Sequence, residues 1–110
     1  MCNEIKAVEI ANIMAGYFRS LYGENMDSVY LYEDNFDYDG EKAEFSVAAI
    51  VNGEQYDLQR KIKQISDPIR NLALENHAKF SFTVVPKHEF EEHKNEWITY
   101  RRIAKGKKIV

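Results

Sequence analysis

The sequence predicts a single α+β domain, in which helices pack on a mixed β-sheet of three to four strands in the order α-β-β-α-β-α-α-(β). Two long segments, residues 3–22 and 57–76, carry apolar residues at helical spacing. Two shorter segments, residues 44–51 and 79–85, are rich in apolar residues and bounded by turn residues or proline, which predicts strands. Because helices separate most of the strands along the chain, we expect helices to cover the sheet.

The first predicted helix covers residues 3–22, where apolar side chains recur at steps of three and four and form one helical face. A second apolar stripe runs beside the first, so the apolar side is wide and is expected to lie against a sheet. The two stripes are Val8, Ala11, Ala15, Phe18 and Tyr22, and Ile10, Met14, Tyr17 and Leu21. Gly23 suits the left-handed position that ends such a helix.

A hairpin is predicted next, from a strand over residues 28–32, a turn at residues 37–40 and a strand over residues 44–51. The second strand starts with alternation and ends almost wholly apolar, which is typical of a central strand buried on both faces. The two strands are predicted to be antiparallel, although the long connection also allows another arrangement. Asn52 and Gly53 close the second strand with a further turn signal.

The second helical region, residues 57–76, contains Pro68 inside its apolar pattern. Ser66 and Asp67 resemble a helix cap before this proline, so the region is predicted to be one kinked helix or two helices joined at Ser66. The remaining predicted elements are a strand over residues 79–85 that Pro86 ends, helices over residues 87–94 and 97–104, and a last short strand over residues 107–110.

Length and composition indicate one globular domain over residues 1–110. The chain is 45% apolar and 30% charged, and its seven Tyr, six Phe and one Trp predict a substantial core. The single cysteine, Cys2, excludes an internal disulfide and a cysteine-based zinc site. Without an export signal or an apolar run long enough to cross a bilayer, we expect a cytoplasmic protein with no membrane contact.

The net charge of −3 gives no general attraction to nucleic acid, but the charges are unevenly placed. Residues 33–44 hold six acidic side chains against Lys42 alone, and residues 101–108 hold five basic side chains and no acid. The favoured interpretation is two solvated surfaces. A functional acidic site and a basic patch are the alternatives.

The acidic loop supplies the candidate metal ligands Asp37, Asp39 and Glu44. Residues 35–40 resemble the first half of a calcium loop, where alternate side-chain oxygens surround the ion and glycine permits a sharp bend. The bidentate Glu expected at the twelfth position is Ser46 in this chain, so a polar hairpin turn is the favoured interpretation. No resident cofactor is predicted, and Mg²⁺ is expected to bind only if these acidic side chains form an active site.

The motifs of the common enzyme classes do not occur in this sequence. There is no HExxH pair, glycine-rich phosphate loop or GxSxG turn, and His77, His88 and His93 lack the spacing of metal ligands. We therefore assign no catalytic residue from the sequence.

Near the C-terminus, Trp97 is followed by Arg101, Arg102 and Lys105. Aromatic stacking with flanking cations is one way to hold single-stranded nucleic acid, so these four residues are candidates for a nucleic-acid or partner contact. The favoured interpretation is ordinary packing, with the Arg101 guanidinium on the Trp97 indole four residues before it.

Three stretches carry a resemblance to a known family. Residues 21–23 end a helix before the strand at residues 28–32, residues 44–51 are similar to an SDxDLxVxV strand, and residues 80–90 precede a closing segment, residues 97–106, similar to fyrrIrkeG. In these stretches the chain resembles the small bacterial nucleotidyltransferase-like domains, the minimal type often found beside a helical partner protein. The resemblance implies that family's fold for most of the chain.

At the family's catalytic positions this chain differs. Active members hold the nucleotide phosphates with a Gly-Ser turn after the first strand, where this chain has Glu33 and Asp34. They bind two Mg²⁺ ions with two carboxylates that alternate on the next strand, where this chain has Glu44 and Ser46. The resemblance therefore implies a version without nucleotidyl transfer.

We expect a non-catalytic nucleotidyltransferase-like domain that acts by protein–protein contact, as an antitoxin-like partner or as a homodimer. One alternative is a diverged metal-dependent nucleotidyltransferase that uses the acidic loop and Glu44. A second alternative is a nucleic-acid binder that uses the basic C-terminal segment, which the net charge disfavours.

Overall fold

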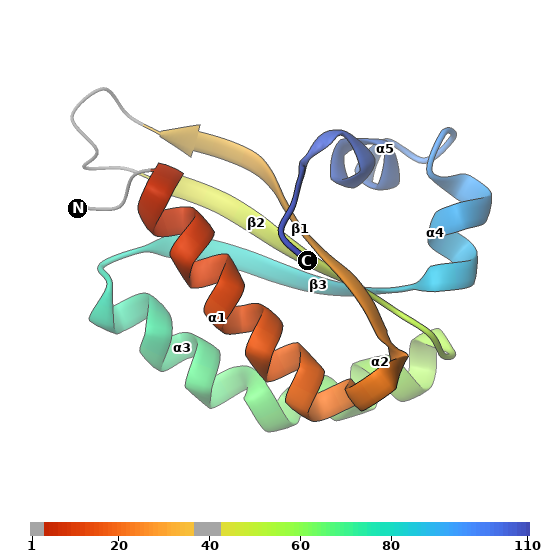
Figure 1. The fold of residues 1–110 in the computed structure, drawn as a ribbon, viewed down its shortest axis with the longest axis horizontal. Coiled ribbons are helices and arrows are strands. Elements are labelled where there is room, and N and C mark those ends of the chain that lie inside the picture. The colour runs from red at the N-terminus through yellow and green to blue at the C-terminus, as the bar shows by residue number, and fades with distance from the viewer. Residues whose placement is uncertain (1–3, 37–42) are drawn as a thin grey trace.

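A computed structural model describes residues 4–36 and 43–110, with side chains described for residues 5–32 and 44–110. It contains a four-stranded mixed sheet with helices packed on it, which confirms the predicted α+β class (Figure 1). Along the chain the elements are α1 (Glu4–Tyr22), η1 (Gly23–Asn25), β1 (Met26–Phe36), β2 (Ala43–Val51), α2 (Gln55–Lys61), η2 (Ile62–Ile65), α3 (Ser66–Glu75), β3 (Lys79–Pro86), α4 (Lys87–His93), α5 (Ile98–Lys105) and β4 (Lys107–Lys108).

The strands lie side by side in the order β3-β2-β1-β4. β1 and β2 form the predicted antiparallel hairpin, and β4 pairs antiparallel with the other edge of β1. β3 runs parallel to β2. Parallel neighbours need a long crossover, and the segment from α2 through α3 supplies it.

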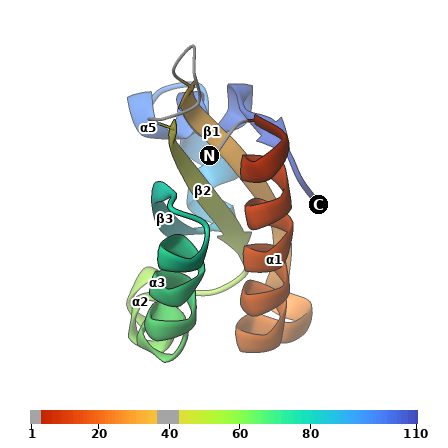
Figure 2. The same cartoon turned by 90° about the vertical axis from the view of Figure 1, so that its left-hand side faces the viewer.

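One face of the sheet carries the main core and is covered by α1 together with the helices of the crossover (Figures 1 and 2). Both predicted stripes of α1 lie in or against this core, and Ile10, Met14 and Phe18 are fully buried. Gly23 follows α1 with a φ of +61°, the left-handed conformation expected of it. The helix was predictable because its apolar spacing matches the face it buries.

The opposite face is covered by α4 and α5, which lie together on it (Figure 1). Phe90 of α4 and Ile103 of α5 pack on Ile50 and Val85, near the carboxyl ends of β2 and β3. Toward the amino end of β3 the side chains become exposed. This part of the face is where the polar residues of β2 and β3 meet.

The helical region before β3 is interrupted rather than continuous, since the short 3-10 segment η2 separates α2 from α3. The predicted cap is wrong: Ser66 is the first residue of α3, and its hydroxyl donates back to the carbonyl oxygen of Ile62 at 3.3 Å. Pro68 lies in the first turn of α3, where a missing N–H interrupts no helical hydrogen bond.

Candidate functional site

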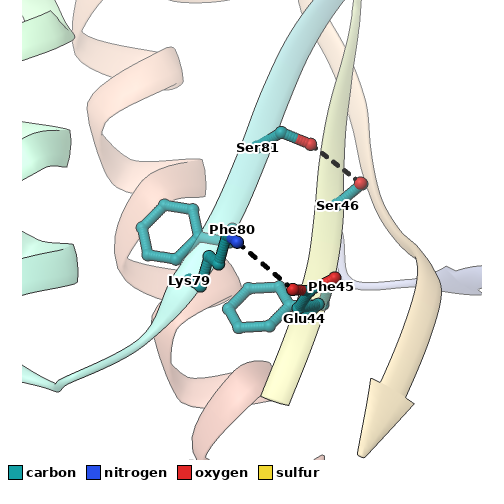
Figure 3. Close-up of a pocket in the computed structure, with 6 residues that line it drawn as sticks. All are labelled: Glu44, Phe45, Ser46, Lys79, Phe80 and Ser81. Carbon is teal, nitrogen blue, oxygen red and sulfur yellow. Dashed lines mark hydrogen bonds and ion pairs between the residues drawn. The ribbon is translucent and has the colours of Figure 1, made fainter. Parts of the chain in front are cut away.

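Four polar side chains gather where β2 and β3 begin, and we call them the β2–β3 polar site. They are Glu44, Ser46, Lys79 and Ser81, and Figure 3 shows them side by side. The parallel register pairs Glu44 with Lys79 and Ser46 with Ser81. Because residues two apart on a strand face the same way, all four side chains belong to one face of the sheet.

The two serines are joined by a hydrogen bond between their hydroxyl oxygens, 2.9 Å apart. Ser46 is buried, with 8% of its surface exposed, whereas Ser81 is exposed. Ser81 is therefore the group through which solvent or a partner reaches this pair. Each hydroxyl can donate one hydrogen bond and accept others.

An ion pair lies beside the serines, with the Lys79 ammonium nitrogen 3.4 Å from a Glu44 carboxylate oxygen. Both side chains are mostly exposed, so solvent screens the pair and it adds little stability. Its effect on the site is electrical: the positive charge of Lys79 offsets the negative charge of Glu44. The site as a whole therefore has no net charge.

The site borders a shallow pocket of about 240 Å³, which these four residues line together with Phe45 and Phe80. The two phenyl rings stack with their centroids 5.1 Å apart and their planes 21° from parallel. These rings point to the opposite face of the sheet, which carries the main core, so the polar face itself presents hydroxyls, one carboxylate and one ammonium group. Among the described lining residues, such a surface can form hydrogen bonds and presents one carboxylate, that of Glu44.

The other predicted metal ligands, Asp37 and Asp39, lie outside the described residues. Glu33 and Asp34 belong to β1, at a point where the register with β2 shifts between Tyr32 and Asn35, and their side chains lie outside the described set. Within the part of the chain that is described, no group of three His, Cys, Asp or Glu side chains gathers as around a metal ion.

Trp97, one of the predicted C-terminal contact residues, belongs to an aromatic cluster that runs from the surface to the core. Trp97 stacks on His93 with ring centroids 3.9 Å apart and planes 4° from parallel, and it lies 5.0 Å from Tyr100. Tyr100 in turn contacts the buried Phe90. Burial, followed by the charge and hydrogen bond of the nearby Glu89, raises the pKa of Tyr100 to about 12.

The cations of this segment do not form the predicted stack. The Trp97 ring meets His93 rather than the Arg101 guanidinium, and Arg101 contacts Trp97 through its backbone N–H, 2.8 Å from the Trp97 carbonyl oxygen. Arg101, Arg102 and Lys105 are all exposed on α5. Trp97 keeps 45% of its surface exposed, so one part of its ring remains accessible.

Sequence reasoning missed Lys79 and Ser81 as members of the site. The alternation of residues 79–85 was a usable signal, because it puts both side chains on one face of β3. The alternation alone does not indicate the register between β2 and β3, which places this face beside Glu44 and Ser46.

Comparisons of the chain with protein-family models, with curated proteins and with solved structures find no match. The resemblance to nucleotidyltransferase-like domains therefore remains a prediction from the sequence. Among the described helices, none combines the length and apolarity that a membrane span requires.

Proposed function

We propose that this chain is a non-catalytic nucleotidyltransferase-like domain that acts by protein–protein contact, as the antitoxin-like partner of a second protein or as a homodimer. The observation that carries the proposal is the hydroxyl pair of Ser46 and Ser81. The resemblance implies a metal-binding carboxylate at two positions of this strand. At one of them this chain has the neutral hydroxyl of Ser46, which is hydrogen-bonded to the hydroxyl of Ser81.

The surroundings of Glu44 support the same conclusion. Mg²⁺ is bound through oxygen ligands, chiefly carboxylates, phosphates and water. Lys79 lies 3.4 Å from the Glu44 carboxylate and competes with a cation for it. A serine hydroxyl at the next position on the same face adds no negative charge. Two-metal nucleotidyl transfer needs more charge than these positions offer.

Protein contact is supported by the start of α5. Trp97 and Ile98 are adjacent in the chain and keep 45% and 64% of their surfaces exposed. Aromatic residues are enriched in protein–protein interfaces, where their large rings lose contact with water. The stack on His93 holds the Trp97 ring in place before any partner binds, which reduces the entropy lost on association.

A metal-dependent nucleotidyl-transfer assay tests the non-catalytic assignment. The full chain is incubated with labelled nucleoside triphosphates and Mg²⁺ or Mn²⁺, and the Glu44→Ala variant is the matched control. We expect both proteins to give only background transfer. Robust transfer by the natural chain that Glu44→Ala abolishes would overturn the assignment.

The contact role is tested by co-expressing the chain with the product of the adjacent gene and measuring their co-purification. Trp97→Ala is expected to weaken the complex at least about tenfold, as for an interface aromatic side chain. Tyr56→Ala is the matched control, since Tyr56 is an aromatic residue with 73% of its surface exposed on α2. Equal loss with both variants would contradict a contact centred on Trp97.

A further inference from the structure

The outer edge of β3 carries unpaired backbone groups. Among the described strands, β3 lies at one edge of the sheet and pairs only with β2; in Figure 2 it is the left-most strand. The side-chain amide of Gln59 donates to the Val84 carbonyl oxygen at 3.1 Å, so this carbonyl points away from β2. Backbone direction alternates along a strand, and Phe82 and Phe80 therefore also point their N–H and C=O groups outward.

These four outward groups have no hydrogen-bond partner in the described part of the chain. Gln59 of α2 reaches Val84 only, and no other backbone bond beyond the β2–β3 ladder involves Phe80 or Phe82. Exposed groups of this kind are a template for another strand.

Along residues 80–83 the edge also lacks the charges, prolines and bulges that usually prevent such pairing. Monomeric proteins protect edge strands with charged residues, prolines or bulges. In β3 the charge and the proline lie at its two ends, Lys79 and Pro86, and the register with β2 is continuous along its whole length. The stretch between them is uncharged and consists of aromatic, hydroxyl and β-branched residues, which favour strand pairing.

We propose that β3 pairs antiparallel with β3 of a second copy of this chain, about a two-fold axis at Ser81. In this register Phe80 faces Phe82 of the second copy, and each pair exchanges two backbone hydrogen bonds. All four outward groups of each copy are then satisfied, and the two sheets become one. This inference rests on the proposed function: it names a second copy of the chain as the partner in the proposed protein contact and the edge of β3 as the contact surface.

The side chains of β3 suit a second copy because the edge is complementary to itself, as a two-fold interface requires. Phe80 and Phe82 are half-buried against the core on one face of the sheet, where they would meet across the axis as aromatic pairs. On the other face Ser81 meets its own counterpart, and Lys79 meets Thr83. No like charges stand opposite each other.

The interface is short, so we expect weak association, with a dissociation constant on the order of 10 µM. Sedimentation equilibrium measures it on the full chain over a range of concentrations. A particle of twice the 12.9 kDa chain mass is the expected high-concentration species. A monomer at every concentration up to about 1 mM overturns the proposal.

Charged substitutions of Ser81 test the proposed register between the two β3 strands. Ser81→Lys and Ser81→Glu each place like charges across the axis and are expected to weaken dimerisation at least about tenfold, whereas an equimolar mixture of the two restores it. Ser81→Ala, which loses the same bond to Ser46 without adding charge, is expected to dimerise like the natural chain. Unweakened dimers of Ser81→Lys, or a mixture that stays monomeric, overturn the proposal.

Cross-linking gives a second measurement that does not depend on charge. Residues opposite each other without hydrogen bonds lie about 4.5 Å apart at their Cα atoms, within the range that a disulfide spans. In a Cys2→Ser background, Ser81→Cys is expected to form a covalent dimer under mild oxidation. Thr83→Cys lies opposite Lys79 rather than its own copy and is expected to remain a monomer with a free thiol. The reverse result overturns the register.

These outcomes separate this inference from the proposed function. If the chain is monomeric and shows no transfer activity, the β3 pairing is wrong and the non-catalytic assignment stands. If it is dimeric and shows Glu44-dependent transfer, the β3 pairing stands and the non-catalytic assignment is wrong.

Discussion

The hydroxyl oxygens of Ser46 and Ser81, register partners on the parallel strands β2 and β3, lie 2.9 Å apart. Their environments differ, because Ser46 is buried and Ser81 is exposed. A single hydrogen bond thus joins a buried hydroxyl to an exposed one. Substitution of Ser46 and substitution of Ser81 should therefore change stability by different amounts.

We predict that Ser81→Ala destabilises the fold more than Ser46→Ala. Removal of Ser81 leaves the buried Ser46 hydroxyl without its protein partner, which costs about 1–3 kcal/mol. Removal of Ser46 leaves an exposed hydroxyl that water can satisfy, and the cost falls to about 1 kcal/mol or less. Urea denaturation of both variants measures the difference. A larger loss for Ser46→Ala would contradict the prediction.

Gly106→Ala is predicted to destabilise the C-terminal part of the fold. A Cβ atom at Gly106 would lie 2.5 Å from the carbonyl oxygen of Leu31 and 2.9 Å from Cβ of Tyr32, both in β1. Neither neighbour is the far end of a flexible side chain, so the connection between α5 and β4 must move. We expect a loss of about 1–3 kcal/mol in the free energy of unfolding.

The matched control for that substitution is Gly16→Ala. Gly16 lies in α1, and a Cβ atom there would have no neighbour within 4 Å. Because alanine is the better helix former, the control should raise stability by about 0.5–1 kcal/mol. Thermal unfolding of the two variants should therefore shift in opposite directions, and shifts of the same sign would be evidence against the close approach at Gly106.

The acid stability of the fold is predicted to depend on the pair of Asp27 and Lys87, whose charged atoms lie 3.0 Å apart. The hydrogen bond from Lys87 holds the pKa of Asp27 below its ordinary value of 3.8. A lowered carboxyl pKa contributes stability above the unfolded value, and this stability is lost as the pH falls through the folded value. Since both side chains are partly exposed, the contribution is at most about 1 kcal/mol.

The variant Lys87→Met should return the pKa of Asp27 toward 3.8, which carboxyl chemical shifts measured during an acid titration report. Lys94→Met is the control, because Lys94 has a similar exposure and pairs with Glu91 at 3.2 Å instead. The Asp27 titration should be the same in this control as in the natural chain. An unchanged Asp27 titration in Lys87→Met would refute the assigned cause.

Tyr22 is predicted to contribute to alkaline unfolding. Its hydroxyl donates to the Leu58 carbonyl oxygen at 2.6 Å, and burial raises its pKa from 10.0 to about 12. The unfolded state therefore loses the proton first, so stability is complete below about pH 10 and falls as the pH rises toward 12. Tyr22→Phe should cost about 1 kcal/mol at neutral pH and reduce the loss between these limits.

Chemical denaturation at neutral and alkaline pH tests this prediction. Tyr100 also has a pKa of about 12, so part of the alkaline loss should persist in Tyr22→Phe. The double variant with Tyr100→Phe should lose still less on alkaline titration. The prediction fails if Tyr22→Phe shows the full alkaline loss of the natural chain.

Much of the fold was predictable because the patterns involved are local. The wide apolar side of α1 follows from its spacing, and the burial of Val47 and Ala48 on both faces of β2 follows from a continuous apolar run. The hairpin was predictable from two neighbouring strands. β1 is longer than expected, since it pairs with β2 as far as Phe36 through Asp and Asn, residues that local preference places outside strands.

The site was less predictable because it depends on contacts between distant segments. Nothing in the pattern of β3 indicates that Lys79 pairs with Glu44 rather than with a residue two positions along. The packing of α4 beside α5 similarly gives Trp97 a nearer neighbour, His93, than the predicted Arg101. Local spacing identifies faces, whereas the register between faces is set by the whole sheet.

The parallel alignment of β2 and β3 also has a consequence for how the chain reaches its native state. The β1–β2 hairpin can form early from nearby residues, but β3 must wait until the crossover from α2 to α3 has closed, and such non-local pairing is slow. During that delay the Phe80–Val85 stretch is free on both edges. The folding rate should therefore be limited by the docking of β3, and refolding at high protein concentration should lose yield to aggregation that begins at this segment.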